Sequence, residues 1–137
     1  MNKITIYCDG GARNNPGPAA IGIVFEEKVK GKGDYSEFIG QATNNEAEYQ
    51  AVIFALKKIK HLIGKEKSKK TEIEIKSDSE LLVNQINGKF KIKEKNLQPL
   101  FLEIWNLKQD FAEVKFTQIP REENKRADFL VNRELDK

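Results

Sequence analysis

Two acidic residues of this sequence come directly after apolar, strand-like segments. Asp9 follows a run that begins at Ile4, and the glycine pair Gly10-Gly11 comes after it. Asp78 follows the run Thr71 to Lys76. A carboxylate at the end of a buried strand is costly to desolvate unless a cation or hydrogen bonds meet it. If the two strands are parallel neighbours, both carboxylates arrive at the edge of the sheet where open α/β sheets bind their ligands.

Two further acidic residues lie on the inward sides of segments with helical spacing. Glu48 begins a stripe that continues at i+4, i+7 and i+11 with Val52, Ala55 and Ile59. Asp128 shares a helix side with Asn124, Val131 and Leu135. A carboxylate that faces an apolar core also requires a partner.

Taken one at a time, these carboxylates also have ordinary structural explanations. Asp9 can accept hydrogen bonds from the following backbone in an Asx turn. Glu48 lies near a helix start, where the helix dipole favours an anion. Asp128 can be an exposed charge beside Arg126 or Asn132.

The four carboxylates together have one economical explanation, which is a metal site. Two like charges about 5 Å apart repel by roughly 3 kcal/mol at an effective dielectric constant of 20, so a cluster requires raised pKa values or bound cations. Ligands that are all oxygens favour the hard ions Mg²⁺ and Mn²⁺. Two such ions can bind the attacking water and the leaving oxygen of a phosphodiester at once. The pattern is therefore typical of two-metal phosphoryl transfer.

The elements that must position these residues follow from hydrophobic spacing. Strands are predicted at about 4–9, 19–25, 35–40, 71–76 and 114–119, and helices at about 43–63, 79–87, 97–110 and 122–135. Thr43 or Asn44 is predicted to cap the first long helix. The glycine pair after Asp9 is predicted to end the first strand. Lys28 to Asp34 and Gly64 to Lys70 are predicted to be polar connections.

This order of elements predicts one α/β domain over residues 1–137. Two short connections make the first three strands antiparallel neighbours. Strands that are separated by helices pair in parallel through right-handed crossovers, so the first, fourth and fifth strands form a parallel part. We therefore expect a five-stranded mixed sheet with helices on both faces.

The composition indicates an ordinary soluble globular protein, with 39% hydrophobic and 33% charged residues. The net charge of +3 implies no partner by itself. The one cysteine, Cys8, excludes a disulfide within the chain and suits a reducing compartment. No signal peptide opens the sequence, and no apolar run is long enough to span a bilayer. We expect a cytoplasmic monomer with no membrane partner.

Four segments carry a resemblance to a known family. They are Tyr7-Cys8-Asp9-Gly10-Gly11 with Asn15-Pro16-Gly17-Pro18 after it, Thr43-Asn44-Asn45-Glu46-Ala47-Glu48, Ser77-Asp78-Ser79, and Asn124-Lys125-Arg126-Ala127-Asp128. In this order, and over nearly the whole chain, they resemble the motifs of type 1 ribonuclease H. The resemblance implies the ribonuclease H-like fold. It also implies an endonuclease that cuts the RNA strand of an RNA–DNA hybrid and leaves 3′-hydroxyl and 5′-phosphate ends.

The resemblance assigns roles to the candidate site residues. The catalytic residues, which would also ligate two Mg²⁺ ions with Mn²⁺ as a substitute, are Asp9, Glu48, Asp78 and Asp128. Glu48 would in addition hold the nucleophilic water and meet a 2′-hydroxyl.

Other motif residues would bind the nucleic acid. Asn15, Asn44 and Asn45 match positions that contact the hybrid near its minor groove, where 2′-hydroxyls and acceptor base edges suit an amide. Thr43 matches a residue that helps to bind a phosphate of the DNA strand, although the same run can simply cap a helix.

The sequence departs from the family pattern at three places. Many relatives have a histidine in the loop before the last aspartate, and here Arg121 is the candidate auxiliary residue in its place. Some relatives carry a long basic handle after the short helix, whereas the link here runs only from Gly88 to Asn96. Its lysines either touch phosphates or form a solvated loop, and they are Lys89, Lys91, Lys93 and Lys95. We also expect no separate hybrid-binding domain before the first strand, because Met1 nearly abuts it.

Two other classes of function fit the same fold. A catalytically inactive module would bind a hybrid or other nucleic acid without cutting it, but such a module should have lost at least one ligand, and all four are present. A relative that acts on DNA, such as an integrase or junction resolvase, is disfavoured by the Asn44-Asn45 pair and by the small size. Fold alone would not separate these options.

Overall fold

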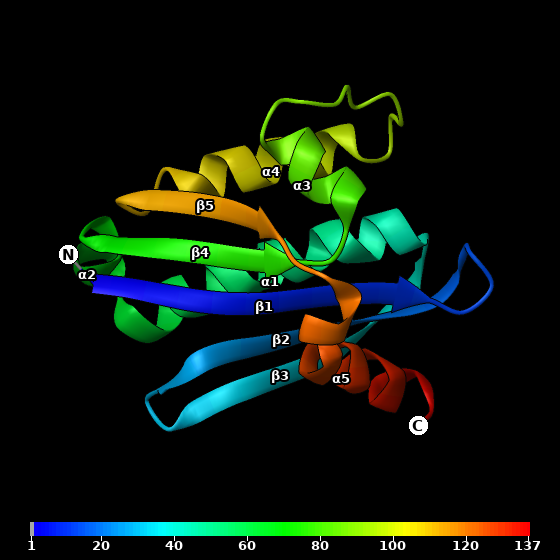
Figure 1. Cartoon of the computed structure of the whole chain (residues 1–137), viewed down its shortest axis with the longest axis horizontal. Helices are drawn as coiled ribbons and strands as arrows, with labels where there is room; N and C mark the ends of the chain where they lie inside the picture. The colour runs from blue at the N-terminus through cyan, green and yellow to red at the C-terminus, as the bar shows by residue number, and fades with distance from the viewer. Residues whose placement is uncertain (1) are drawn as a thin grey trace.

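The chain folds around one five-stranded sheet, as the computed structural model describes for residues 2–137 (Figure 1). In chain order the elements are β1 (Asn2–Ala12), β2 (Gly17–Val29), β3 (Lys32–Ala42), α1 (Asn44–Ile63), α2 (Lys65–Lys69), β4 (Thr71–Ser77), α3 (Glu80–Ile86), α4 (Gln98–Lys108), β5 (Glu113–Gln118) and α5 (Lys125–Leu135). A 3₁₀ turn, Arg121–Glu123, precedes α5. No helix among the described residues is long and apolar enough to cross a membrane.

The strands lie in the order β3-β2-β1-β4-β5, with β1 at the centre. β2 pairs antiparallel with both β1 and β3, whereas β4 pairs parallel with both β1 and β5. The predicted mixed sheet is therefore confirmed. A short link makes the next strand run antiparallel beside the previous one. A helical crossover brings the chain back so that the next strand runs parallel.

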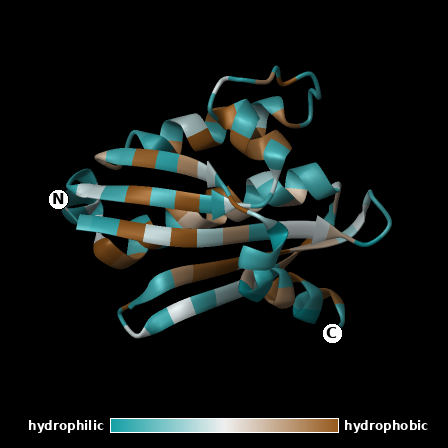
Figure 2. Cartoon of the chain, in the orientation of Figure 1, coloured by the Kyte–Doolittle hydropathy of each residue, from teal (hydrophilic) through white to brown (hydrophobic). Residues whose placement is uncertain are grey.

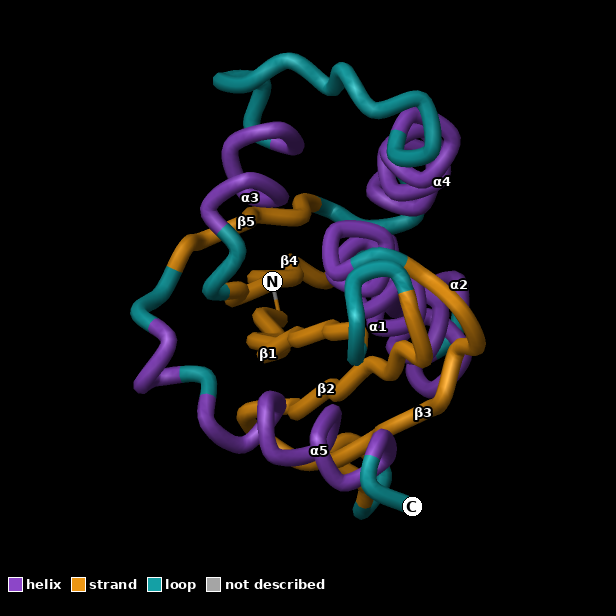
Figure 3. Tube along the Cα trace, turned by 90° about the vertical axis from the view of Figure 1, so that its right-hand side faces the viewer, coloured by secondary structure: helices purple, strands orange, loops and turns teal. Residues whose placement is uncertain are grey.

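Helices lie on both faces of the sheet, with α1 and α4 on one side and α5 on the other (Figure 3). The main core lies under α1 and contains alternate residues of the central strands, such as Ile6, Ile73 and Ile75. Figure 2 shows this alternation as brown and teal bands along β4 and β5. On the opposite face α5 covers β2 and β1, and over β4 that face carries polar groups such as Glu74, which pairs with Lys3.

The central strand continues through its glycine pair. The prediction that Gly10-Gly11 ends the first strand is wrong, because β1 runs to Ala12 with both glycines paired to β2. Asp9 therefore lies within β1, opposite Gly22 of β2. Hydrogen bonds to the neighbouring strand outweigh the low strand propensity of glycine at this place.

The two predicted polar connections are also wrong. Most of residues 28–34 belongs to β2 and β3, which meet in a turn at Lys30-Gly31. Residues 65–69, expected to be part of a loop, form the short helix α2. The Ser68 hydroxyl donates to the Gly64 carbonyl (2.7 Å), so a buried side chain closes this turn of helix.

The last helix begins later than its spacing predicts. A continuous helix from about residue 122 is expected, but a 3₁₀ turn ends at Glu123 and α5 begins at Lys125. The break lies at Asn124, whose side-chain Nδ2 donates to the Cys8 carbonyl (2.9 Å). This buried bond joins the start of α5 to the central strand.

Gly22 allows α5 to lie close against the sheet. A Cβ atom at this position would overlap the backbone oxygen of Ala127 and lie 3.0 Å from Cβ of Leu130. We expect Gly22→Ala to lower the free energy of unfolding by about 3 kcal/mol, because the helix or the strand must shift to remove the overlap.

Urea unfolding of the purified variants measures this effect. Gly33→Ala is the control, since its added Cβ would meet only the flexible side chain of Lys28 closely (3.3 Å). Equal unfolding midpoints for Gly22→Ala and wild type would contradict the close approach of α5.

Candidate active site

The site is built where the central strand extends beyond its parallel neighbour. The pairing of β1 with β4 ends at Tyr7 and Lys76, and Asp78 comes directly after β4. Asp9 lies two residues past the last pair and is still within β1. The two carboxylates therefore meet where the strands part, which is the position expected for a ligand of an open sheet.

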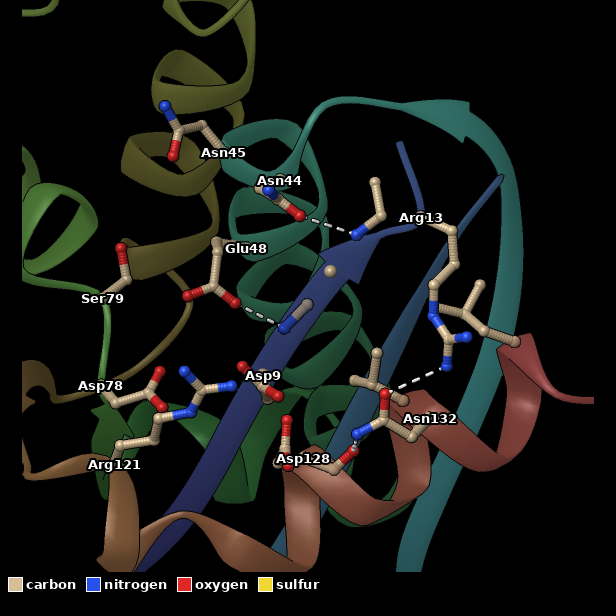
Figure 4. Close-up of a pocket in the computed structure, with 15 residues that line it drawn as sticks. Asp9, Arg13, Asn44, Asn45, Glu48, Asp78, Ser79, Arg121, Asp128 and Asn132 are labelled. Carbon is tan, nitrogen blue, oxygen red and sulfur yellow. Dashed lines mark hydrogen bonds between the residues drawn. The ribbon is translucent and has the colours of Figure 1, made fainter. Parts of the chain in front are cut away.

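A close approach of α1 to β1 brings Glu48 to the same place. A Cβ atom on Gly10 would overlap the backbone of Ala47, so glycine is required for the first turns of α1 to lie this near. The Gly10 amide donates to Glu48 Oε1. Figure 4 shows the Glu48 side chain in the cleft with those of Asp9 and Asp78. The helical spacing thus predicts correctly that Glu48 faces the sheet.

The start of α1 is held by residues to which the family resemblance assigns nucleic-acid binding. Thr43 is the N-cap, because its Oγ1 accepts from the Glu46 amide (3.0 Å) and Glu46 Oε1 accepts from the Thr43 amide (2.8 Å). Asn44 Oδ1 accepts from the Ala12 amide (2.8 Å), and Asn15 Oδ1 accepts from the Asn44 amide (2.8 Å). The predicted helix cap is therefore confirmed for Thr43, and Asn15 joins the β1–β2 loop to the helix start.

An open cleft of about 450 Å³ contains all four candidate carboxylates (Figure 4). Asn44, Asn45 and Arg121 also line it. Asn15 and Thr43 are not among its lining residues, but both hold the start of α1, which carries Asn44 and Asn45 into it.

Three of the four carboxylates form a tight group. Oxygen atoms of Asp9, Glu48 and Asp78 all lie within 4.8 Å of one another. Asp128, in the first turn of α5, lines the same cleft but does not belong to that group. The expected cluster of four thus has an inner set of three, with Asp128 beside it on the α5 side.

Burial and mutual repulsion raise the pKa values of the inner set. Burial first, and then the charge of Asp78, raise the pKa of Asp9 from 3.8 to about 7. Burial and the charge of Asp9 hold the pKa of Glu48 well above 4.5. Burial also raises the pKa of Asp78, and the guanidinium of Arg121 opposes that rise.

The carboxylate group lacks a neutralising ion pair within the described part of the chain. None of the ion pairs formed among residues 2–137 includes Asp9, Glu48, Asp78 or Asp128. Arg121 projects into the cleft toward Asp78 without forming such a pair (Figure 4). A partly buried group of carboxylates that its own chain leaves without an ion pair favours binding of a cation from solution.

Two cleft residues were not singled out from the sequence. Arg13 donates to Asn132 Oδ1 (3.2 Å) and pairs with Asp136 (3.0 Å), which joins the β1–β2 loop to α5. Asn132 Nδ2 donates in turn to the carbonyl of Asp128 (3.1 Å). The available signals were the i+4 spacing of Asn132 from Asp128 and the place of Arg13 within the first motif.

Comparison with known proteins places this chain in a family. A family model described as reverse transcriptase-like matches residues 7–134. Ribonuclease HI of Halobacterium salinarum is 36% identical over 138 residues, which cover 98% of this chain and 65% of that protein. The bifunctional protein Rv2228c of Mycobacterium tuberculosis is 35% identical over 136 residues, which cover 98% of this chain and 36% of that protein. The chain thus spans 36% to 65% of the length of these curated relatives.

Solved structures match over nearly their whole chains. LC11-RNase H1, isolated from compost by a metagenomic approach and solved in complex with an RNA/DNA hybrid, is 44% identical with a TM-score of 0.87, and the match covers 97% of this chain and 96% of that one. RNase H1 of Halobacterium salinarum is 35% identical with a TM-score of 0.85, and the match covers 98% of both chains. The chain belongs to the type 1 ribonuclease H family. The resemblance based on four motifs and the predicted ribonuclease H-like fold are both confirmed.

The link between α3 and α4 of this ribonuclease H domain is short. Residues 87–97 form no helix between the two elements, in agreement with the predicted absence of a long basic handle. The four lysines predicted for this link are all exposed.

Proposed function

We propose that this chain is an endoribonuclease that hydrolyses the RNA strand of RNA–DNA hybrids and leaves 3′-hydroxyl and 5′-phosphate ends. The observation that carries the proposal is the group of Asp9, Glu48 and Asp78 at the open cleft of a ribonuclease H family member. A relative with 44% identity has been crystallised with an RNA/DNA hybrid, which supports the substrate class.

The donor set of the cleft fits two divalent ions. Asp9, Glu48, Asp78 and Asp128 offer only oxygen atoms, which are the ligands of Mg²⁺ and Mn²⁺. Burial and the charge of Asp78 raise the pKa of Asp9, and a bound dication would favour the charged carboxylate against both effects. When bound, two such ions activate the attacking water and stabilise the leaving oxygen of the phosphodiester.

The chain's own side chains orient the reacting groups. Glu48, held by the amide of Gly10, accepts hydrogen bonds from the attacking water and from a 2′-hydroxyl of the RNA. Asn44 and Asn45 present amide groups from the cleft wall to the minor groove, where the 2′-hydroxyl distinguishes RNA from DNA.

Thr43 and Asn15 support these contacts by fixing the start of α1, which carries Asn44 and Asn45. Both hold the helix start through hydrogen bonds to backbone amides. Thr43 is in addition proposed to contact a phosphate of the DNA strand. Contacts to backbone and groove carry little sequence information, so base preference should be slight.

The proposed activity is tested with one labelled RNA strand, offered in a hybrid, in an RNA duplex and as a free strand. We expect cleavage of the hybrid in Mg²⁺ or Mn²⁺ and none in EDTA, with 3′-hydroxyl and 5′-phosphate products. Hybrid binding without cleavage in either metal would contradict the proposal and would indicate an inactive binding module.

Arg121 is proposed to assist turnover in place of the histidine that many relatives carry in this loop. Its guanidinium lies in the cleft, and its positive charge opposes the rise in the pKa of Asp78 that burial causes. We expect Arg121→Ala to lower kcat about ten- to a hundredfold, because a fixed positive charge beside the reacting phosphodiester is lost.

Initial rates at saturating hybrid measure this loss of turnover. Arg126→Ala is the matched control, since Arg126 pairs with Asp34 on the surface. If Arg121→Ala cleaves as fast as Arg126→Ala, Arg121 has no role in turnover.

A further inference from the structure

The link between α3 and α4 is irregular in secondary structure but held at several points. We define the lysine loop as residues 88–96, and Figure 3 shows the chain arching here from α3 to α4. The amides of Lys89 and Phe90 both donate to the Asn84 carbonyl (2.8 and 3.1 Å). Ile92 packs against the hydrophobic core. The loop is therefore anchored at its beginning and in its middle.

Two glutamine side chains, one from each flanking helix, bind consecutive carbonyl groups of the lysine loop. Gln85 Nε2 of α3 donates to the Lys91 carbonyl (3.1 Å). Gln98 Nε2 of α4 donates to the Ile92 carbonyl (3.0 Å). The bond from Gln85 is partly buried and the bond from Gln98 is exposed, and together they fix where the loop lies relative to its two flanking helices.

The side chain of Gln85 is itself held from α1. The Tyr49 hydroxyl donates to Gln85 Oε1 (2.6 Å), and the two residues are 0% and 2% exposed. Replacing a buried hydrogen-bonded pair by apolar groups of the same shape can be nearly neutral for stability. Removing only one partner leaves the other buried and unpaired, so a single substitution here also requires a stability control. Tyr49 follows Glu48 directly, so the bonds from Tyr49 through Gln85 to Lys91 connect the helix that carries a candidate catalytic residue to the lysine loop.

The lysine loop presents positive charge next to the candidate active site. An open cleft of about 500 Å³ runs along it, lined by Gln85, Phe90 and three of the exposed lysines, Lys89, Lys91 and Lys93. At the far end of the loop, Asn45 Nδ2 donates to Glu94 (3.4 Å). Because Asn45 also lines the active-site cleft, the lysine loop adjoins that cleft at Glu94.

We propose that Tyr49 and Gln85 are positioning residues for substrate binding, which hold the lysine loop at a set distance from α1 so that its lysines contact backbone phosphates of the bound duplex. This inference rests on the proposed function, because it takes an RNA–DNA hybrid as that duplex. A loop that is already ordered loses less conformational freedom when it binds than a mobile loop does. The hydrogen bonds of Gln85 therefore act on affinity, while the carboxylates act on the chemical step.

The main test is Gln85→Met, which removes both hydrogen bonds and keeps the length of the side chain. Hybrid binding is measured by fluorescence anisotropy in EDTA, where no cleavage takes place, at several salt concentrations. We expect binding about five- to tenfold weaker near 0.1 M salt and a salt slope smaller by about one to two, as one or two phosphate contacts are lost. In Mg²⁺ the same variant should raise KM by the same factor as the loss of affinity and should retain kcat. The lost contacts bind the substrate and the transition state equally.

Further variants separate positioning from a general loss of stability. Tyr49→Phe should weaken binding in the same direction, and adding it to Gln85→Met should cause no further loss, because the hydroxyl acts through Gln85. Ile59→Val trims a buried core side chain of α1 and should lower Tm without changing the salt slope. In a background with Lys89, Lys91 and Lys93 each replaced by glutamine, Gln85→Met should have no further effect on affinity.

Unchanged affinity and salt slope in both Gln85→Met and Tyr49→Phe would overturn the positioning role. An equal additional loss of affinity in the background without these lysines would also overturn it. The binding measurements do not depend on turnover. Failure of the wild-type protein to cleave the hybrid would therefore count against the proposed activity, and failure of Gln85→Met to alter binding would count against the positioning role alone.

Discussion

Replacing Asp9 with asparagine is expected to reduce cleavage of an RNA–DNA hybrid by at least about a thousandfold, because charge stabilisation by bound metal ions is worth several kcal/mol in such a reaction. Oxygen atoms of Asp9 lie within 4.8 Å of those of both Glu48 and Asp78, so a metal ion bound by this carboxylate would also be close to the other two. The amide keeps the shape of the side chain but removes the charge that holds a dication. Hybrid binding should change little, since we expect the duplex contacts to come from other residues.

Single-turnover cleavage and fluorescence anisotropy measure the two effects separately. Asp110→Asn is the matched control, because Asp110 pairs with Lys60 (3.0 Å) and does not line the cleft. Cleavage by Asp9→Asn at the rate of this control would remove Asp9 from the proposed metal site. A loss of binding as large as the loss of cleavage would show that the substitution acts on the duplex and not on the chemistry.

The metal-free protein is expected to lose a stabilising contribution as the pH rises from about 4 to about 7. Burial and the charge of Asp78 raise the pKa of Asp9 from 3.8 to about 7 in the folded state. Between these values the folded protein keeps a proton that the unfolded chain has released, so the contribution is complete below pH 3.8 and is lost as the pH rises through 7. About three pKa units correspond to at most about 4 kcal/mol. The raised pKa values of Glu48 and Asp78 act in the same direction.

Urea unfolding in EDTA at a series of pH values tests this dependence. Glu46 and Glu74 have lowered pKa values and act in the opposite direction, so the difference between wild type and Asp9→Asn isolates the effect of Asp9. The variant should be the more stable protein at pH 8, and the difference should shrink toward pH 4. Mg²⁺ at pH 8 should stabilise the wild type more than the variant, because a ligand stabilises the state that binds it. A variant that is less stable than wild type at pH 8 without metal would contradict the predicted repulsion.

The sequence by itself determined the four carboxylates of the candidate site and the order of the strands and of the longer helices. Glu48 is recognisable because helical periodicity is local, and the apolar stripe that follows it defines an inward face. Asp78 is recognisable because the alternating residues of β4 end just before it. The mixed sheet follows from link lengths, since a short link and a helical crossover impose opposite strand directions. Each of these features depends on residues that are close together in the sequence.

Only the tertiary structure decided how these elements end and how closely they approach. Gly10 weakens a strand locally, yet β1 continues through it because Gly10 pairs with Ile21 and leaves room for Ala47 of α1. Asn124 would continue a helix by spacing alone, but its side chain bonds to Cys8, which is 116 residues away.

The shape of the carboxylate cluster and the order of the lysine loop were likewise not readable from the sequence. Asp128 has the same chemistry as the other three carboxylates, and the packing of α5 on the sheet is what leaves it beside the inner set. The lysine loop has the composition of a solvated link, but Gln85 and Tyr49, from two different helices, hold it in place. In each case the deciding partner is distant along the chain. Local propensity therefore carries no signal for it, and the contact exists only once the sheet and its helices have packed.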